Sequence, residues 1–175
     1  MKKLTTILAA LGFFLSASAF TPATGDDDFY RILKVAKEKS VKITTVSNLI
    51  SEAFKQKFAR AENVNWNRIE NFYFVSFQMK ETDLTAAYGD DGEFIAVSRR
   101  VNFDQLPLAI SDAINEKYKG YVIPANVTEI ALQGETSYYL TVEGKTSYRQ
   151  LKCYSNGDIT VEKKIKKKVL IGNAY

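Results

Sequence analysis

Residues 71–79 read Asn-Phe-Tyr-Phe-Val-Ser-Phe-Gln-Met, and this stretch has the period-two alternation of a half-buried β-strand. Alternate residues of a strand point to opposite faces of a sheet. One face of this strand is apolar throughout and consists of Tyr73, Val75, Phe77 and Met79. The other face carries Phe72, Phe74, Ser76 and Gln78. We therefore expect the first set to face the core and the second set to face outward.

The same strand recurs 65 residues later, where Tyr138-Tyr139-Leu140-Thr141-Val142 matches Tyr73-Phe74-Val75-Ser76-Phe77. A helical pattern precedes each copy. In the first copy its apolar positions are Val46, Leu49, Ile50, Ala53, Phe54 and Phe58. Sixty residues later they are Leu106, Ala109, Ile110, Ala113, Ile114 and Tyr118. Asp91-Gly92 and Asn156-Gly157, again 65 residues apart, are strong hairpin-turn signals. These matches indicate an internal duplication.

The repeat predicts an α+β fold of two tandem units, residues 45–103 and 104–165, followed by a basic C-terminal tail to residue 175. Each unit is predicted to hold one helix and four strands. The predicted strands are residues 64–69, 71–79, 83–89 and 93–101, then 127–133, 137–143, 146–154 and 158–165. Short turns pair consecutive strands antiparallel, and helices on one face of such a sheet give a two-layer sandwich. Because a unit of about 60 residues buries little surface alone, we expect the halves to share one sheet.

The first 19 residues have the pattern of a bacterial signal peptide. Lys2 and Lys3 precede an uncharged apolar run, residues 7–15, and small residues at 17–19 offer a cleavage site. The run is shorter than the ~20 residues that a membrane-spanning helix needs. We therefore expect cleavage after Ala19, no stable membrane insertion, and a periplasmic or secreted mature protein; the alternative is an N-terminal membrane anchor. Residues 20–44 are interpreted as a linker that contains a short helix.

The composition argues against several classes of function. The chain of 175 residues has no histidine and one cysteine, which removes the commonest general base, an intramolecular disulfide and a cysteine-rich metal site. Removal of Lys2 and Lys3 lowers the formal net charge from +4 to +2, so the mature chain lacks the basic footprint of a nucleic-acid binder. We therefore predict no cofactor, no metal and no nucleic-acid partner. Cys153 follows a strand-like alternation and is interpreted as a buried small hydrophobe, with a reactive thiol as the alternative.

A resemblance to a known family rests on the order of the motifs. A helix, then Asn63-Val64 with Trp66 two residues on, then an aromatic hairpin and Asp91-Gly92, resembles the PepSY-like, beta-lactamase-inhibitor-protein-like domains of secreted bacterial proteins. Leu106-Pro107 at the start of the second helix and Lys117-Tyr118-Lys119-Gly120 at its end carry the same likeness, which covers roughly residues 45–165.

The resemblance implies tandem α/β repeats with a curved antiparallel sheet. It also implies a binding role, because the inhibitor that gives the family its name presents its concave sheet face to an enzyme, and PepSY relatives are proposed to restrain peptidases. The chain departs from that inhibitor in lacking disulfides. Inhibition of a beta-lactamase, and the individual contact residues of the inhibitor, are therefore not carried over.

The outward face of the predicted sheet supplies the candidate partner-binding residues. They are Phe72, Phe74, Tyr139, Tyr148, Tyr154 and Lys152. Aromatic side chains among short polar ones are typical of protein-recognition surfaces. We therefore predict an exported, non-enzymatic binding module of an inhibitor-like kind that recognises an exported protein or peptide. The alternatives are that these rings only stabilise the sheet as cross-strand pairs, or that the N-terminal segment covers them.

Two other functions remain open at this point. The first is a small hydrolase or lyase that uses the carboxylates of Asp90, Asp91 and Glu93, which cluster at a hairpin turn. The second is a carrier of a small apolar ligand in a cavity between helices and sheet. The sequence contains no Gly-x-Ser-x-Gly elbow, phosphate loop or dinucleotide fingerprint, so no catalytic residue is assigned.

Three local features complete the predictions. Trp66 is expected to pack in the core or at a sheet edge. The five lysines of Lys163–Lys168 are expected to discourage edge-to-edge pairing of an exposed terminal strand. The last strands of the two copies disagree about which residues face inward, since Ile95 and Val97 align with Thr160 and Glu162; a β-bulge would explain the difference.

Overall fold

Short turns connect most of the strands, so each strand pairs antiparallel with the one before it. The computed structural model describes residues 29–31, 33, 41–69 and 71–167. Within these residues nine strands form one sheet, in the order in which they occur along the chain. The strands are β1 (Val41–Ile43), β2 (Glu62–Ile69), β3 (Phe72–Met79), β4 (Thr82–Gly89), β5 (Phe94–Asn102), β6 (Asn126–Leu132), β7 (Glu135–Glu143), β8 (Ser147–Tyr154) and β9 (Ile159–Lys166). The predicted signal peptide and its cleavage after Ala19 lie outside the described residues.

Two α-helices and one 3-10 turn interrupt the strands. They are α2 (Asn48–Lys57), η1 (Phe103–Gln105) and α3 (Leu108–Lys117); residues 29–31 and 33 are helical as well. The Ser47 hydroxyl accepts a hydrogen bond from the Ile50 amide at 3.4 Å and caps the start of α2. Pro107 precedes the first residue of α3, where its missing amide hydrogen costs nothing. Both helices lie within the two predicted helical stretches.

The predicted fold of tandem helix-plus-four-strand units in a two-layer sandwich is wrong. All nine strands belong to one sheet, which includes β1, a strand inside the predicted linker. Strand β5 pairs with β6 from Ala96–Leu132 to Asn102–Asn126. The sheet is therefore continuous from the first predicted unit to the second. Helices are few in the described part of the chain, where α2 and α3 have ten residues each. The expectation that the two halves share one sheet is confirmed, whereas the tandem units and their two-layer arrangement are not.

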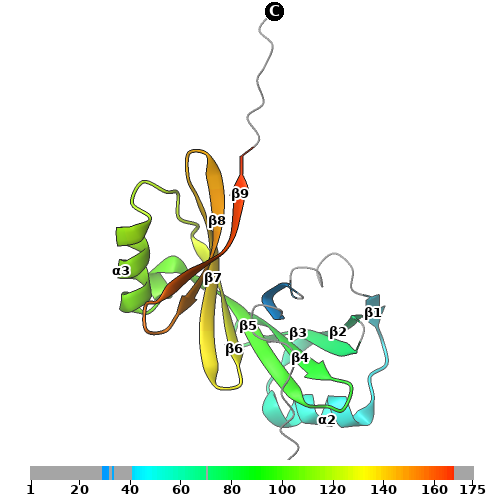
Figure 1. Ribbon diagram of the computed structural model, residues 1–175. Helices are drawn as coiled ribbons and strands as arrows, with labels where there is room; N and C mark the ends of the chain where they lie inside the picture. Colours follow the sequence, from blue (N-terminus) through cyan, green and yellow to red (C-terminus); the bar gives the residue numbers. More distant parts are fainter. Residues whose placement is uncertain (1–28, 32, 34–40, 70, 168–175) are drawn as a thin grey trace, which may run out of the picture.

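Both helices pack on the same face of the sheet, which we call the helix face; it includes Trp66, Val75 and Leu140. The opposite face, which includes Phe74, Ser76 and Tyr139, we call the groove face. Figure 1 shows α2 beside the first half of the sheet and α3 beside the second, with the strands turning through a large angle between them. The helical residues 29–31 and 33 lie on the other side of the sheet from α2 (Figure 1).

Helix α2 covers the first half of the helix face with aromatic side chains. Its Phe54 ring lies 5.1 Å from the ring of Phe77 and 5.4 Å from the indole of Trp66, both edge-on. Edge-to-face pairs at this distance add to the stabilisation that burial of apolar surface gives. Trp66 therefore packs against the core, as predicted, and no ligand is needed to explain this residue.

Helix α3 covers the second half with aliphatic side chains. Its Ile110 and Ile114 are fully buried against a cluster that includes Leu140, Leu151 and Cys153. Cys153 is 0% exposed, and burial raises the pKa of its thiol to about 12 from the ordinary 9.0. The prediction that the Cys153 thiol is buried is confirmed.

Beta-bulges explain why the two copies differ in their last strands. The pairing of β4 with β5 shifts between Ala87 and Tyr88, and the pairing of β8 with β9 shifts between Gln150 and Leu151. A bulge adds one residue to a strand and reverses which side chains face inward beyond it. Because the two shifts fall at different places, the copies cannot share one inward pattern.

The glycines of the two predicted hairpin turns touch the two helices. Gly92 has φ +81° and lies against the Leu49 side chain of α2. Gly157 has φ +92°, and a Cβ atom there would lie 2.9 Å from the Ala109 carbonyl oxygen of α3. A backbone atom cannot move aside as a flexible side chain can. The β8–β9 turn is therefore fitted to α3 by the absence of a side chain at position 157.

Replacement of this glycine tests the contact. We expect Gly157→Ala to lower the free energy of unfolding by about 2–4 kcal/mol, because the positive φ costs ~1 kcal/mol and the clash with α3 adds overpacking strain. The matched control is Gly134→Ala in the β6–β7 turn, where φ is +88° and no atom lies within 4 Å of the new Cβ. Urea unfolding of both variants checks this, and equal losses would contradict the fitted contact.

The Tyr88 hydroxyl is a buried polar group in the apolar cluster beneath α2. The side chain is 0% exposed, and its hydroxyl has no hydrogen-bond partner among the described residues. Burial raises the pKa of Tyr88 to about 12. A buried hydroxyl without a partner costs free energy that the ring's packing against Trp66 and Phe94 must offset.

Removal of that hydroxyl should not destabilise the protein. We expect Tyr88→Phe to leave the free energy of unfolding unchanged or to raise it by up to about 1 kcal/mol. The control is Tyr138→Phe, since burial and then the neighbouring Glu129 carboxylate raise the pKa of Tyr138, which places an acceptor near its hydroxyl; this variant should lose about 1 kcal/mol. Thermal and urea unfolding measure both changes, and a clear loss in Tyr88→Phe would show that its hydroxyl has a partner.

Stability should fall in alkaline solution. The thiol of Cys153 and the phenol of Tyr88 stay protonated to about pH 12 in the folded chain, whereas in the unfolded chain they ionise near 9.0 and 10.0. Their raised pKa values leave stability unaffected below pH 9 and reduce it as the pH rises towards 12. Urea unfolding between pH 8 and 11 should show a smaller loss for Cys153→Ala than for the wild type. Parallel curves for the two proteins would contradict this account.

Candidate functional site

The six predicted partner-binding residues all lie on the groove face, but they do not form one exposed surface. Phe74 and Tyr139 are 2% and 1% exposed, and Lys152 is 5% exposed. Phe72, Tyr148 and Tyr154 are half-buried. The predicted alternation of faces is therefore right for these strands, while exposure was overestimated for three of the six residues.

The N-terminal helical residues cover the centre of this face. The Phe29 ring stacks on the Phe74 ring at 6.2 Å, and the Tyr30 ring stacks on the Tyr139 ring at 4.1 Å. Phe29 and Tyr30 are themselves 2% and 6% exposed. The alternative in which the N-terminal segment covers the aromatic residues therefore describes Phe74 and Tyr139.

Three of the remaining predicted residues, Tyr148, Lys152 and Tyr154, lie on β8 and take part in cation–ring contacts, whereas Phe72 of β3 packs against the cluster that Phe29 and Tyr30 cover. The Lys152 ammonium lies 4.9 Å from the centre of the Tyr154 ring and 6.0 Å from that of Tyr139. The Lys167 ammonium lies 5.1 Å from the Tyr148 ring. An ammonium over an aromatic ring is stabilised by the negative face of the ring, so Lys152 tolerates burial here.

The residues that Phe29 and Tyr30 cover form a strip across the groove face. Beside this covered strip, a row of small polar side chains crosses four strands. Register aligns Asn65 of β2 with Ser76 of β3, Ser76 with Thr85 of β4, and Thr85 with Ser98 of β5. The parallel row two residues away holds Phe74, Ala87 and Ala96, which the N-terminal residues cover. On the far side stand the longer side chains of Gln78, Asp83 and Arg100. Short side chains between two taller walls leave a groove.

The groove has a volume of about 630 Å³ and opens to solvent. Tyr30 and Leu33 line one wall, and Asn63, Gln78, Asp83 and Arg100 are among the residues of the other side. Its floor hydroxyls contact each other and the main chain: Ser76 Oγ lies 3.4 Å from Thr85 Oγ1, and Ser98 Oγ donates to the Thr85 carbonyl at 3.4 Å. These bonds are long, so the hydroxyls can also bind a ligand.

Carboxamides extend the polar lining at the β2 end. The Asn63 side-chain amide donates to Gln78 Oε1 at 2.8 Å, and the Asn65 amide donates to the Asn63 carbonyl at 2.9 Å. Asn63 has φ 53° and lies where the pairing of β2 with β3 shifts. The bulge thus turns Asn63 and Asn65 together towards the groove.

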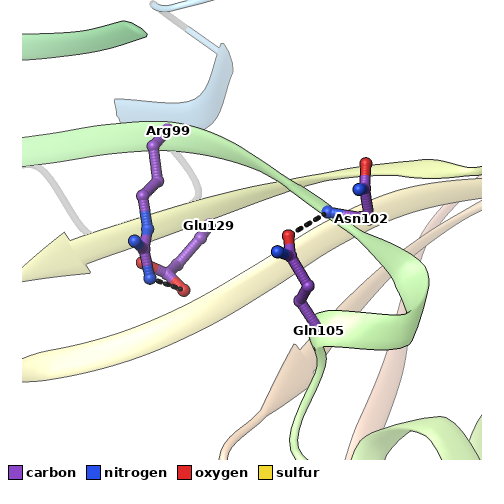
Figure 2. Close-up of polar contacts among 4 residues, drawn as sticks. All are labelled: Arg99, Asn102, Gln105 and Glu129. Carbon is purple, nitrogen blue, oxygen red and sulfur yellow. Dashed lines mark hydrogen bonds and ion pairs between the residues drawn. The ribbon is translucent and has the colours of Figure 1, made fainter. Parts of the chain in front are cut away.

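Three charged residues line the groove, Asp83, Arg99 and Arg100, and all three are exposed. Arg100 makes no ion pair within the described part of the chain, whereas its neighbour Arg99 points to the helix face and is paired. The Arg99 guanidinium donates to both carboxylate oxygens of Glu129, at 2.6 and 3.1 Å (Figure 2). This bidentate bond raises the pKa of Arg99. Arg99 therefore joins β5 to β6, whereas Arg100 lies on the groove face and lines the groove.

The end of β5 is fixed by a second polar contact. The Asn102 amide donates to Gln105 Oε1 at 2.9 Å (Figure 2). The contact closes the 3-10 turn η1 and directs the chain from β5 towards α3. It is a structural contact, and neither residue lines the groove.

The carboxylates considered for catalysis lie elsewhere. Asp90, Asp91 and Glu93 occupy the β4–β5 turn, where Asp91 Oδ1 accepts a hydrogen bond from the Glu93 amide at 3.0 Å. This is a turn-stabilising contact. In the part of the chain that the structure describes, no group of three or more His, Cys, Asp or Glu residues is placed to hold a metal ion.

Sequence reasoning missed the groove residues Thr85, Ser98 and Arg100. Each of them is ordinary in a strand, and only the register between β3, β4 and β5 places them in one row with Ser76. The signal was present in the alternation of these strands, since Thr85 and Ser98 fall on outward positions. Without the pairing register, however, the positions could not be aligned.

Comparisons with known proteins show similarity at the level of the fold. No family profile matches the chain, and no curated protein does. None of the described helices is long and apolar enough to cross a membrane. A BLIP-like protein from Bacteroides fragilis NCTC 9343 superposes with a TM-score of 0.63 at 20% identity, over 72% of this chain and 91% of that one.

Two further solved structures agree with this result. A DUF2874 family protein from Bacteroides ovatus ATCC 8483 has a TM-score of 0.61 at 19% identity, over 71% of this chain and 89% of the other. A protein from Bacteroides eggerthii DSM 20697, whose name suggests a periplasmic location, has a TM-score of 0.60 at 17% identity, over 70% and 90%. The protein therefore has the fold of the BLIP-like and DUF2874 structures; the likeness supports the BLIP-like part of the predicted resemblance and leaves its PepSY-like part unsupported.

Proposed function

We propose that the protein is an exported, non-enzymatic binding module that holds an extended segment of another exported protein in the groove. The observation that carries the proposal is the cross-strand row Asn65, Ser76, Thr85 and Ser98, which lines an open groove with hydroxyl and carboxamide groups. Export is supported by the signal-peptide pattern of the first 19 residues.

The chemistry of the floor suits a peptide main chain. Hydroxyls and carboxamides can each donate and accept hydrogen bonds, and an extended peptide presents N–H and C=O groups in alternation. The groove crosses the strands, so a bound segment would meet side chains from β2 to β6 in turn. Such a floor favours main-chain recognition, with sequence preference supplied by the walls.

The walls supply charge and apolar contact. Arg100 is exposed on one side, where its guanidinium can pair with an acidic side chain of the ligand, and Asp83 lines the same groove and would repel a second acid. Tyr30 and Leu33 give the other side an apolar surface. We therefore expect the bound segment to carry an acidic residue on one edge and an apolar residue on the other.

A binding role is favoured over a reaction because of what surrounds the hydroxyls. The closest polar partners of Ser76 and Ser98 are Thr85 atoms, a hydroxyl and a main-chain carbonyl. Neither can act as the general base that an attacking hydroxyl needs. The name BLIP-like, given to one structural neighbour, fits a binding module as well.

Reversal of the charge at Arg100 should weaken the capture of a partner protein. We expect Arg100→Glu to reduce the recovery of a bound envelope protein at least ten-fold, since it replaces an attraction for an acidic side chain by a repulsion. The control is Arg60→Glu, which makes the same charge change at an exposed turn after α2. Immobilised wild type and variants are incubated with extract of the bacterial envelope, and bound proteins are quantified by mass spectrometry. Equal recovery by all three proteins would refute the groove as the binding site.

A further inference from the structure

The strip that the N-terminal residues cover is shaped to receive a pair of aromatic rings. Along one cross-strand row, Phe74 is followed by Ala87 and then Ala96, and both alanines are 0% exposed. Ile130 and Tyr139 bound the strip on β6 and β7. Two methyl side chains between larger ones leave a depression in the sheet surface, and the rings of Phe29 and Tyr30 fill it.

The rings make stacked contacts that have a defined geometry. Phe29 and Phe74 are stacked with 22° between their planes, and Tyr30 and Tyr139 with 16°. Adjacent residues thus engage two different rings, one on β3 and one on β7. A helical turn that carries two consecutive aromatic residues matches the strip, whereas a single aromatic residue would fill only half of it.

The strip and the groove share a boundary. Leu33 packs against the strip and Tyr30 belongs to it, and both line the groove. A ligand that fills the groove therefore meets these residues directly.

We propose that the strip is a docking site for a short helical segment with two consecutive aromatic residues, carried by an exported partner protein, and that the chain's own Phe29–Leu33 segment competes for it. The inference deepens the proposed function, on which it rests, by naming the chemistry that the partner presents. The partner segment replaces Phe29 on Phe74 and Tyr30 on Tyr139, while the adjoining part of the partner continues into the groove. Effective concentration favours the chain's own segment because it is tethered, so a partner must supply contacts in the groove as well.

The test uses a fluorescently labelled peptide of residues 26–36 and the full chain. We expect the F29A/Y30A variant, whose strip lacks the two aromatic rings, to bind this peptide at least ten-fold more tightly than the wild type does. A peptide that carries the same two alanines should not bind. Fluorescence anisotropy measures the affinities. Binding of the peptide with equal affinity to wild type and variant, or failure to bind a folded F29A/Y30A chain, would overturn the proposal.

A second variant guards against misfolding of the first. Tyr30→Ala keeps the Phe29–Phe74 stack and should bind the peptide at least three-fold more tightly than the wild type. Circular dichroism and cooperative unfolding establish that each variant is folded. Replacing the ring beneath, with Tyr139→Ala in the F29A/Y30A background, should weaken peptide binding at least ten-fold; unchanged binding there would place the peptide elsewhere and overturn the proposal.

Envelope extract then separates this inference from the proposed function. The F29A/Y30A chain should capture more of the partner than the wild type, and an excess of the unlabelled wild-type peptide, but not of its double-alanine form, should block that capture. Capture that the wild-type peptide leaves unchanged would refute docking of the partner on the strip. Arg100 lies outside the strip, so Arg100→Glu in the F29A/Y30A background should still bind the peptide. A groove that fails its own test would therefore leave the peptide result standing, and the reverse also holds.

Discussion

The pairing of β5 with β6 is the contact on which the rest of the structure depends. It aligns Val97 with Ala131 and Val101 with Val127, and Arg99 and Glu129 reinforce it with a bidentate ion pair on the helix face. Side chains in a sheet alternate with a period of two, so a shift of one residue would move every side chain of one half to the other face. The helices α2 and α3 could then no longer share a face. This register is therefore what makes one sheet out of two similar stretches of chain.

The groove follows from the same register. Ser76, Thr85 and Ser98 form a row only because β3, β4 and β5 pair as they do. The N-terminal residues Tyr30 and Leu33 on one side, and longer side chains on the other, turn that row into a hollow. Stability and binding thus use different faces of the same strands: Val75, Ala86 and Val97 face the helices at positions next to the groove residues. Substitutions in the groove can change ligand contacts without removing core side chains, which is how one fold can serve several partners.

Much of the local structure could be predicted from the sequence, because it rests on interactions between residues close in the chain. The alternation in residues 71–79 placed Tyr73, Val75 and Phe77 against a helix, and it placed Phe74 and Ser76 on the opposite face. The helical stretches, the turns at Gly92 and Gly157, and the buried state of Cys153 were predicted as well. Each of these depends on spacing or on an intrinsic preference for a backbone conformation.

The features that the sequence did not yield depend on contacts between distant parts of the chain. The tandem sandwich was wrong because repetition does not reveal the additional strand β1 or the continuous ladder from β5 to β6, which together make one nine-stranded sheet. Phe74 and Tyr139 were placed on the right face but were expected to be exposed, since alternation cannot say that Phe29 and Tyr30 cover them. Thr85, Ser98 and Arg100 were missed because no local pattern distinguishes them from other outward residues.

The covered strip changes how an aromatic sheet face should be interpreted. Exposed aromatic residues are a common mark of recognition surfaces, yet here the most central ones are already engaged by the chain itself. A face that holds Phe29 and Tyr30 has the shape and chemistry to bind aromatic rings, whether they belong to this chain or to another. The internal occupant explains why the protein does not expose a large apolar patch on this face.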